Sequence, residues 1–304
     1  MFSLPNLIIP GAPKSATTSL VEYFKPHKDI FVPSIKEPRF FISETIQNLP
    51  MTDPFRQNLI DSSTLTSDAY GNLYKESGSA KYRCDASVHY MYYHNVVIPQ
   101  IKKLVNDPTI IIILRNPVER AFSNYTFLKE YEPNSFEEAL ALEEQRKNNG
   151  WNSFWFYAGQ GFYYEQVNHY LTAFPKVKIV LMDDFSKDVD AEMKAIFDFL
   201  EVDPIEINTK TIYNKSGVPR NKFIEWLIFK DNFLKKIPRY FINKIYDSGE
   251  RARIKRNIQN RFIKKGDLTI SEQTYNHLVD GYHEDILKLQ DLIQKDLSGW
   301  LNKK

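Results

Sequence analysis

Residues 6–20 read Asn-Leu-Ile-Ile-Pro-Gly-Ala-Pro-Lys-Ser-Ala-Thr-Thr-Ser-Leu, and they set the fold expected for the whole chain. The apolar run 7–9 predicts a buried strand, and the turn at Gly11–Pro13 leads to a single lysine, Lys14. The hydroxyl residues that follow are typical of the start of a helix. Backbone N–H groups at a helix start carry partial positive charge, and Lys14 adds a full one. The stretch therefore predicts a site for a phosphorylated or sulfated anion.

This turn differs from the loop that binds the phosphates of ATP and GTP. That loop reads G-x-x-x-x-G-K-[ST], with its lysine on the β- and γ-phosphates and its hydroxyl on Mg²⁺. Counted from Gly11, Thr17 takes the lysine position, whereas Lys14 lies three places earlier. The spacing disfavours a nucleoside triphosphatase and leaves a phosphate-loop kinase for small molecules as an alternative function.

The segment Pro13-Lys14-Ser15-Ala16-Thr17-Thr18 resembles the 5′-phosphosulfate loop of sulfotransferases, which use 3′-phosphoadenosine 5′-phosphosulfate (PAPS). The resemblance implies that these six residues bind the cofactor and that Lys14 also acts in catalysis. It implies a P-loop-like sulfotransferase fold, which is an α/β fold of three layers with a mostly parallel central sheet and helices on both faces. The alternation of apolar strands with helical stretches favours the same parallel architecture.

A second motif follows a later apolar run. The β-branched residues Thr109–Leu114 predict a strand buried on both faces, and Pro117 suits the first turn of a helix after it. Arg115 and Ser123 resemble the family's arginine and serine that hold the 3′-phosphate of PAPS. A guanidinium suits this role because it presents a planar, permanently charged set of donors. The sequence leaves open whether Arg120 shares the site or is a surface or structural arginine.

A third segment bears on the chemistry. Lys36-Glu37-Pro38-Arg39-Phe40-Phe41 resembles the Lys-Glu-Pro-x-Phe-Phe segment of heparan-sulfate-type sulfotransferases, where the glutamate is the proposed general base. The resemblance implies that Glu37 takes the proton of the acceptor, while Lys36 and Lys14 neutralise the leaving group. Partial burial of the loop predicts that the pKa of Glu37 is raised towards neutral pH.

Two other residues compete for the role of base. Cys84-Asp85-Ala86-Ser87-Val88-His89-Tyr90 lies where cytosolic sulfotransferases carry Lys-Thr-His and heparan-type enzymes carry Lys-Thr-Pro-x-Tyr. Ala86 and Val88 replace the heparan-type lysine and proline, and Val88 also stands at the position of the cytosolic histidine. The carry-over of glycan contacts is therefore weaker here. His89 and Asp85 remain alternative bases.

The C-terminal part of the chain carries one more resemblance. The segment 214–222 is similar to the family's loop over the 3′-phosphate, which implies contacts from Gly217 and Arg220 and an optional one from Lys222. Residues 221–304 are expected to form a C-terminal helical region.

The chain length suits one large core. We expect residues 1–304 to form a single sulfotransferase domain. Within it, residues 44–80 are rich in polar side chains and are expected to be an insertion that forms a loop region on the acceptor side of the site.

Charge and cysteine usage narrow the possible partners. The net charge is +2, but residues 229–266 hold twelve Lys or Arg against three Asp or Glu. We interpret this stretch as amphipathic helices with solvated basic faces and expect no nucleic-acid partner, because no binding motif accompanies it. One cysteine excludes an internal disulfide, and no signal peptide or transmembrane segment is apparent, so the expected location is cytoplasmic. The oligomeric state stays open.

The motifs together predict a PAPS-dependent sulfotransferase. The expected reaction moves a sulfuryl group in line to a hydroxyl or amine, requires no metal and releases adenosine 3′,5′-bisphosphate. The heparan-type segment favours a glycan, polysaccharide or glycolipid acceptor. A small-molecule natural product is an alternative acceptor, and a non-catalytic binder of polyanions is the remaining class.

Overall fold

The structure, a computed structural model, describes residues 4–207, 218–219, 263–264 and 269–304. Contacts along the chain define two compact units, which are Met1–Thr211 with Ile270–Lys304, and Ile212–Thr269. In the second unit, β6 (Val218–Pro219) pairs antiparallel with β7 (Ile263–Lys264). The elements described below belong to the first unit.

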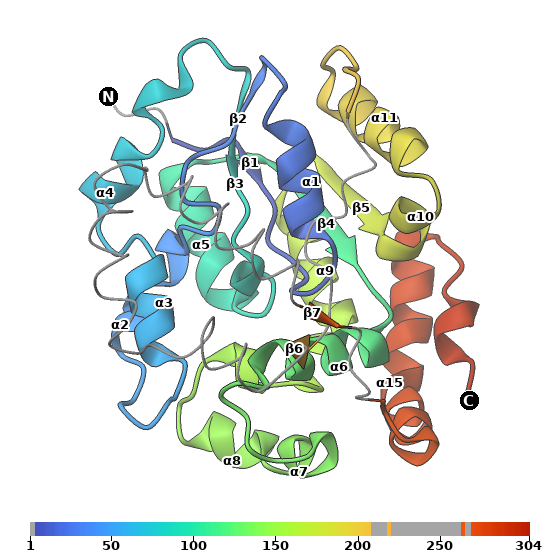
Figure 1. The fold of residues 1–304 in the computed structure, drawn as a ribbon. Coiled ribbons are helices and arrows are strands. Elements are labelled where there is room, and N and C mark those ends of the chain that lie inside the picture. Colours follow the sequence, from blue (N-terminus) through green and yellow to red (C-terminus); the bar gives the residue numbers. More distant parts are fainter. Residues whose placement is uncertain (1–3, 208–217, 220–262, 265–268) are drawn as a thin grey trace. The chain divides into compact units, whose positions relative to one another are not determined.

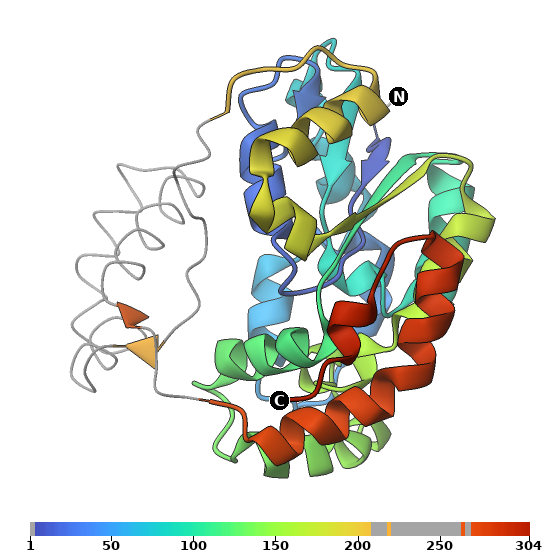
Figure 2. The ribbon, with the colours of Figure 1, turned by 90° about the vertical axis from the view of Figure 1, so that its right-hand side faces the viewer.

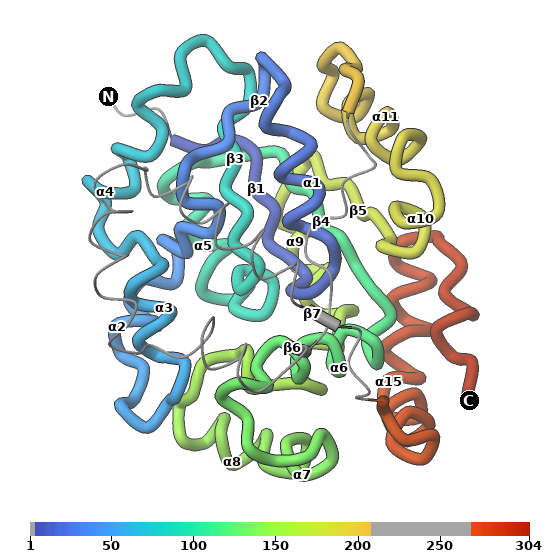
Figure 3. The backbone as a smooth tube through the Cα atoms, viewed as in Figure 1, coloured from blue at the N-terminus to red at the C-terminus, as the bar shows by residue number. Residues whose placement is uncertain are grey.

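A five-stranded parallel sheet forms the centre of the first unit. Its strands are β1 (Leu7–Ile8), β2 (Ile30–Phe31), β3 (Tyr82–Asp85), β4 (Thr109–Leu114) and β5 (Val177–Leu181). The strand order is β2-β3-β1-β4-β5, so β1 lies in the middle with β3 and β4 beside it (Figure 3). In the register, Leu7 pairs with Cys84 and with Thr109. The predicted parallel sheet is confirmed.

The core of the sheet is β4. All six of its residues are buried, and Ile110–Leu114 are fully inaccessible to solvent. A strand covered on both faces reads as a continuous apolar run rather than an alternating one, as the sequence of β4 does. Its predicted bounds and burial are therefore confirmed.

Helices cover both faces of this sheet (Figures 1 and 2). One face carries α1 (Thr17–Phe24), α10 (Met182–Lys187) and α11 (Val189–Leu200). There the ring of Tyr23 packs against Phe185, and Phe24 packs against Phe197. The other face carries α5 (His94–Leu104) and α9 (Tyr163–Ala173), with α15 (Glu272–Ile293) packed along α9. The predicted three-layer arrangement is confirmed.

Residues 44–80 fold into short helices rather than a loop. The helices are α2 (Ser43–Gln47), α3 (Arg56–Ser62) and α4 (Ser67–Asn72), followed by a 3₁₀ turn at Lys75–Ser77. Leu59, Tyr70 and Tyr74 from this stretch are buried in the main core. The buried carboxylate of Asp53 accepts hydrogen bonds from Asn152 and from the indole of Trp155. The stretch is therefore an integral wall of the fold, in spite of its polar composition.

The remaining described helices follow β4 in the chain. They are α6 (Pro117–Leu128), α7 (Phe136–Ala141) and α8 (Glu143–Asn148), with 3₁₀ turns at Phe40–Ile42, Val88–Tyr90, Ser153–Trp155, Gly159–Gly161 and Ser298–Leu301. Asn116 caps α6 by accepting from the N–H groups of Val118 and Glu119, and Pro117 occupies the first turn as predicted. Within the described ranges, every helix is too short or too polar to cross a bilayer.

Candidate functional site

The turn between β1 and α1 is the candidate anion site, and we call it the cradle. Helix α1 begins at Thr17, directly after a turn in which Lys14 and Ala16 adopt positive φ angles of 67° and 61°. This backbone aims the free N–H groups of the first helical turn out of the end of the sheet. The hydroxyl of Ser15 is fully buried and has no hydrogen-bond partner in the described part of the chain. An anion bound here would supply that partner.

The cradle lies against the segment that follows β3. The N–H of Met91 donates to the carbonyl of Pro10 at 2.9 Å. Gly11 is required at this contact, because a Cβ there would lie 2.9 Å from the Cβ of Met91 and 3.1 Å from the carbonyl oxygen of Val88. The cradle therefore lies next to the segment that carries the alternative bases Asp85 and His89.

Lys14 lies in a crowded positive environment. Its Nζ sits 4.3 Å from the centre of the Phe127 ring. Burial and the nearby guanidinium of Arg115 lower the pKa of Lys14 to about 8, against the opposing charge of Glu37. A lysine whose ammonium is destabilised in this way gains from a bound anion, since the anion restores the favourable charge balance.

Arg115 joins the second motif to the first. It follows the last residue of β4, and its Nη1 donates to the carbonyl of Lys14 at 3.3 Å. Its Nη2 pairs at 3.1 Å with Glu119, which lies in the first turn of α6. Ser123 lies on the same helix and is buried. The structure therefore places Arg115 beside the cradle and Ser123 on the helix that follows it.

Arg120, which the sequence left undecided, is fully buried. Its Nη2 donates to the carbonyl of Tyr157. Its Nε and Nη1 are buried without a partner among the described residues. A surface position is therefore excluded, and its charge contributes to the lowered pKa of Lys14.

Lys36 and Glu37 reach the start of α1. The Nζ of Lys36 lies 3.3 Å from Oγ1 of Thr17 and 3.2 Å from Oγ1 of Thr18. The same ammonium donates to Oε1 of Glu37 at 3.0 Å. Lys36 therefore stands between the anion cradle and the predicted base, in contact with both.

Arg39 holds the other oxygen of Glu37. Its Nη2 donates to Oε2 of Glu37 at 2.6 Å, and its own side chain is only 10% exposed. Arg39 is itself anchored, because its Nη1 donates to the hydroxyl of Ser62 at 3.1 Å and its backbone N–H donates to Ser87 at 2.9 Å. Three segments far apart in sequence thus fix the position of one carboxylate.

The predicted upward shift of the Glu37 pKa is wrong. Burial does raise it, but the adjacent charges of Lys36 and Arg39 outweigh burial and hold the pKa of Glu37 at about 2. The side chain of Glu37 is 18% exposed. It is therefore a carboxylate at any physiological pH, and its basicity depends on how firmly the two cations hold it.

His89 is buried next to the same network. Its Nδ1 accepts from Nε of Arg39 at 3.3 Å, which assigns the ring proton to Nε2. Burial and the charge of Arg39 lower the pKa of His89 to about 3, so the ring is neutral. Nδ1 already accepts a hydrogen bond and Nε2 carries a proton, so neither nitrogen is free to take a proton from a substrate. This arrangement disfavours His89 as the base.

Asp85 is the centre of a closed hydroxyl network. Its carboxylate accepts from Tyr70 at 2.7 Å, from Ser87 at 2.6 Å and from Tyr90 at 3.0 Å, and it is fully buried. Burial raises the pKa of Asp85 to about 6, against the lowering effect of these hydrogen bonds. The hydroxyl of Ser87 donates to Asp85 and accepts from the backbone N–H of Arg39. Asp85 therefore helps to hold the loop of residues 36–39 in place.

Sequence reasoning missed the roles of Arg39 and of Tyr70, which donates to Asp85. The only local signal for Arg39 was a cation between Pro38 and two phenylalanines, at a position that the family pattern leaves free. Tyr70 lies in the stretch that composition marked as an insertion. The predicted contacts from Gly217, Arg220 and Lys222 lie outside the described residues, as does the basic stretch 229–266 apart from β7.

Comparison with known proteins identifies the family. The sulfotransferase domain family matches residues 4–225, which is more than half of the chain, and the chain therefore belongs to that family. The resemblance stated from the sequence is confirmed. Membership of this family favours a sulfotransferase over the small-molecule kinase that the sequence left as an alternative. Enzymes of this family generally use PAPS.

Individual relatives are more distant. The chain is 23% identical to carbohydrate sulfotransferase 15 of Homo sapiens and to that of Mus musculus, over 70% of this chain and 46% of each relative. It thus spans about half the length of the curated relatives it matches. The crystal structure of a sulfotransferase from Alicyclobacillus acidocaldarius aligns with a TM-score of 0.73 and 27% identity, covering 99% of this chain and 100% of the other.

Proposed function

We propose that this chain transfers the sulfuryl group of PAPS to a hydroxyl or amine of a carbohydrate acceptor. One observation carries the proposal: Lys36 contacts both the hydroxyls at the start of α1 and the carboxylate of Glu37. A group-transfer enzyme needs an anion site and a base within reach of one another. Lys36 joins the two.

The residues of the cradle fit PAPS. The buried, unpartnered hydroxyl of Ser15 and the destabilised ammonium of Lys14 both call for a bound anion. Arg115 and Ser123 would hold the 3′-phosphate, and the start of α1 would hold the 5′-phosphosulfate. When bound, PAPS supplies the sulfuryl group and a bisphosphate leaving group. Lys14 would neutralise the charge that develops on the leaving oxygen, without a metal.

Glu37 would act as the base through release by Lys36. With a pKa of about 2, the carboxylate is held too tightly to be a strong base. Lys36 can divide its hydrogen bonds between Glu37 and an anion at Thr17 and Thr18, which weakens its hold on Oε1. The pKa of Glu37 then rises when the cradle is filled, and Oε1 becomes free to take the acceptor proton. Arg39 keeps Oε2 in place during this change.

The carbohydrate acceptor rests on two supports. The Lys36–Phe41 segment matches the heparan-type pattern, and the curated relatives are named carbohydrate sulfotransferases. A glycan, polysaccharide or glycolipid is the favoured acceptor, and a small natural product is the second candidate.

The proposed location is the cytoplasm. The single, buried cysteine Cys84 suits a reducing compartment of this kind.

The test is a transfer assay in buffer without Mg²⁺. The full chain is incubated with PAPS and two acceptor panels, one of oligosaccharides and one of small phenols and alcohols, and products are weighed by mass spectrometry. We expect a sulfo group on an oligosaccharide and the appearance of adenosine 3′,5′-bisphosphate. Sulfation confined to the small-molecule panel would overturn the acceptor, and no transfer to either panel would overturn the activity.

A further inference from the structure

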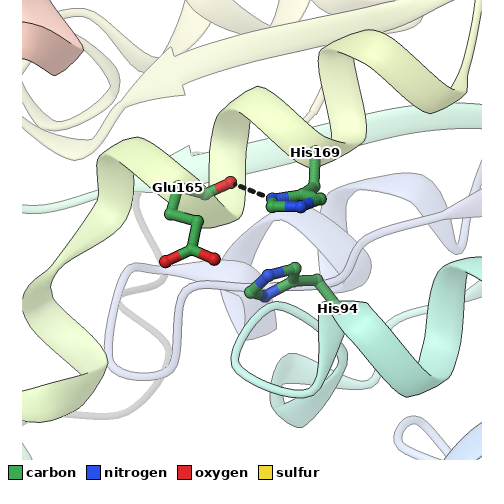
Figure 4. A group of neighbouring side chains, drawn as sticks. All are labelled: His94, Glu165 and His169. Atoms are coloured by element: carbon green, nitrogen blue, oxygen red, sulfur yellow. Dashed lines mark hydrogen bonds between the residues drawn. The ribbon is translucent and has the colours of Figure 1, made fainter.

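A second cluster of polar side chains lies on the face of the sheet covered by α5 and α9. His94 is the first residue of α5, and Glu165 and His169 are one turn apart on α9 (Figure 4). One ligand atom from each of the three lies within 4.8 Å of the other two. The centres of the two imidazole rings are 4.5 Å apart. None of these residues takes part in the site described above.

Both histidines are held as the tautomer that metal binding through Nε2 requires. Nδ1 of His94 lies 3.2 Å from the carbonyl of Met91, and Nδ1 of His169 lies 2.7 Å from the carbonyl of Glu165. Because a carbonyl only accepts, each Nδ1 carries the proton and each Nε2 keeps its lone pair. A backbone carbonyl behind the ring is the usual second contact of a metal-binding histidine.

The inner histidine has an unmet need for a partner. His94 is only 6% exposed, and its Nε2 is buried with no hydrogen-bond partner within the described ranges. Figure 4 shows its ring facing His169 and Glu165. Two imidazoles that both present acceptors cannot satisfy one another, whereas a cation between them would satisfy both.

We propose that His94, Glu165 and His169 bind one Zn²⁺ ion and thereby tie the start of α5 to α9. Two imidazole nitrogens and one carboxylate suit a borderline-soft divalent metal and do not suit Mg²⁺ or Ca²⁺, which prefer all-oxygen sites. Three protein ligands leave a fourth position open to water. The cluster borders a cavity of about 870 Å³, whose lining includes Tyr164 and Asp285, so solvent reaches that position.

The expected effect is on the stability of the fold. α5 directly continues the segment that carries Asp85 and His89, and α9 packs against both α5 and α15. A metal that binds only the folded chain stabilises it in proportion to the logarithm of its concentration over its dissociation constant. The ion would therefore stabilise the position of the segment that carries Asp85 and His89. It would not contact the reacting atoms.

The experiment measures metal binding rather than activity. The full chain is stripped with a chelator, dialysed, and titrated with Zn²⁺ and separately with Mg²⁺ by calorimetry, while melting curves are recorded with each ion. Co²⁺ is used as a spectroscopic probe, because its visible absorption reports imidazole ligation. The variants are His169→Ala and Glu165→Gln, and His283→Ala is the matched control, since His283 is exposed on α15 outside the cluster.

We expect one Zn²⁺ per chain, a higher melting temperature with Zn²⁺ than with Mg²⁺, and the same behaviour in His283→Ala. His169→Ala and Glu165→Gln should each weaken Zn²⁺ binding by about tenfold or more. Glu165 is exposed, so Glu165→Gln decides the matter if His169→Ala does not fold. Zn²⁺ binding of equal strength in wild type and in the folded variants would overturn the proposal, and so would the absence of binding to wild type.

Discussion

The proposed cofactor loop at residues 10–17 and the proposed base loop at residues 36–39 lie against one another but are held in different ways. The cofactor loop is shaped by its backbone: β1 fixes its start, α1 fixes its end, and Ala16 takes a left-handed conformation between them. The base loop is held by side chains from distant segments, chiefly through Arg39. The first is a local structure, and the second exists only in the assembled fold.

This difference separates two functions that can be tested apart. Anion binding should survive the loss of the Glu37 carboxylate, because the backbone of the cradle does not depend on that side chain. Base catalysis should be sensitive to every contact that places the Glu37 carboxylate. Lys36 links the two loops, because its ammonium contacts Thr17 of the cofactor loop and Glu37 of the base loop.

The largest expected effect comes from Glu37→Gln. The amide keeps the shape of the carboxylate but cannot take the acceptor proton, so kcat should fall by about 10²–10⁴-fold. The affinity for adenosine 3′,5′-bisphosphate should change far less than kcat, since the backbone of the cradle remains intact. Steady-state kinetics and calorimetry on the same preparation measure the two effects.

The matched control for this variant is Glu44→Gln, an exposed glutamate on α2. It should leave both quantities unchanged. If His89→Ala abolished turnover while Glu37→Gln stayed within a few-fold of wild type, the base would have been assigned to the wrong residue. The heparan-type argument for a carbohydrate acceptor would then lose its support.

The next effect concerns Lys14. In Lys14→Ala the leaving oxygen loses a preorganised positive charge, so kcat should fall by about 10²–10³-fold, more than the affinity for the bisphosphate product falls. Lys28→Ala, an exposed lysine beyond α1, is the control. A raised KM for PAPS with unchanged kcat would instead make Lys14 a ground-state binder.

A smaller effect is a pH dependence of cofactor binding. Burial and then Arg115 lower the pKa of Lys14 to about 8 in the free protein, and a bound phosphate raises it again. Below pH 8 the ammonium is present and binding is strongest. Above it, affinity for adenosine 3′,5′-bisphosphate should fall by about tenfold per pH unit, until the pH passes the pKa of the complex. Calorimetry from pH 7 to pH 10 tests this, and a flat profile would contradict it.

The smallest effect is on the free energy of unfolding when the positive-φ residue of each loop is replaced by glycine. Ala16 has a φ of 61°, a conformation that costs an L-residue about 1–2 kcal/mol, whereas glycine adopts it freely. Ala16→Gly should therefore raise the free energy of unfolding, by up to about 1 kcal/mol after the added chain entropy is subtracted. Arg39 has a φ of 52°, but Arg39→Gly should destabilise, because its side chain holds the loop. Urea unfolding compares the two, and stabilisation by Arg39→Gly would break the contrast.

The same contrast explains what the sequence could predict. β1, β4 and the start of α6 follow from local patterns: continuous apolar runs, a glycine turn, and Pro117 in the first turn of a helix. The positions of Lys14 and Arg115 at strand ends follow from those elements, because parallel strands bring their ends to one edge of the sheet.

Features made by long-range contacts were beyond reach. The direction of the Glu37 pKa shift was predicted from burial alone, and it is wrong because Arg39 adds a second cation to the carboxylate. The network around Asp85 recruits Tyr70 from α4, and composition gave no sign that this polar stretch packs into the core. The pairing of His94 with α9 depends on how two helices pack, which residue spacing does not encode.

The most direct test of the account compares adenosine 3′,5′-bisphosphate with adenosine 5′-monophosphate by calorimetry on the wild-type chain. The central claim is that the edge of the sheet reads a 3′-phosphate through Arg115 and Ser123 beside the cradle. A charged hydrogen bond contributes about 1.5–3 kcal/mol, so the bisphosphate should bind about tenfold more tightly or better. Arg115→Ala should remove most of that advantage. Equal affinities of the wild type for the two nucleotides would contradict the claim.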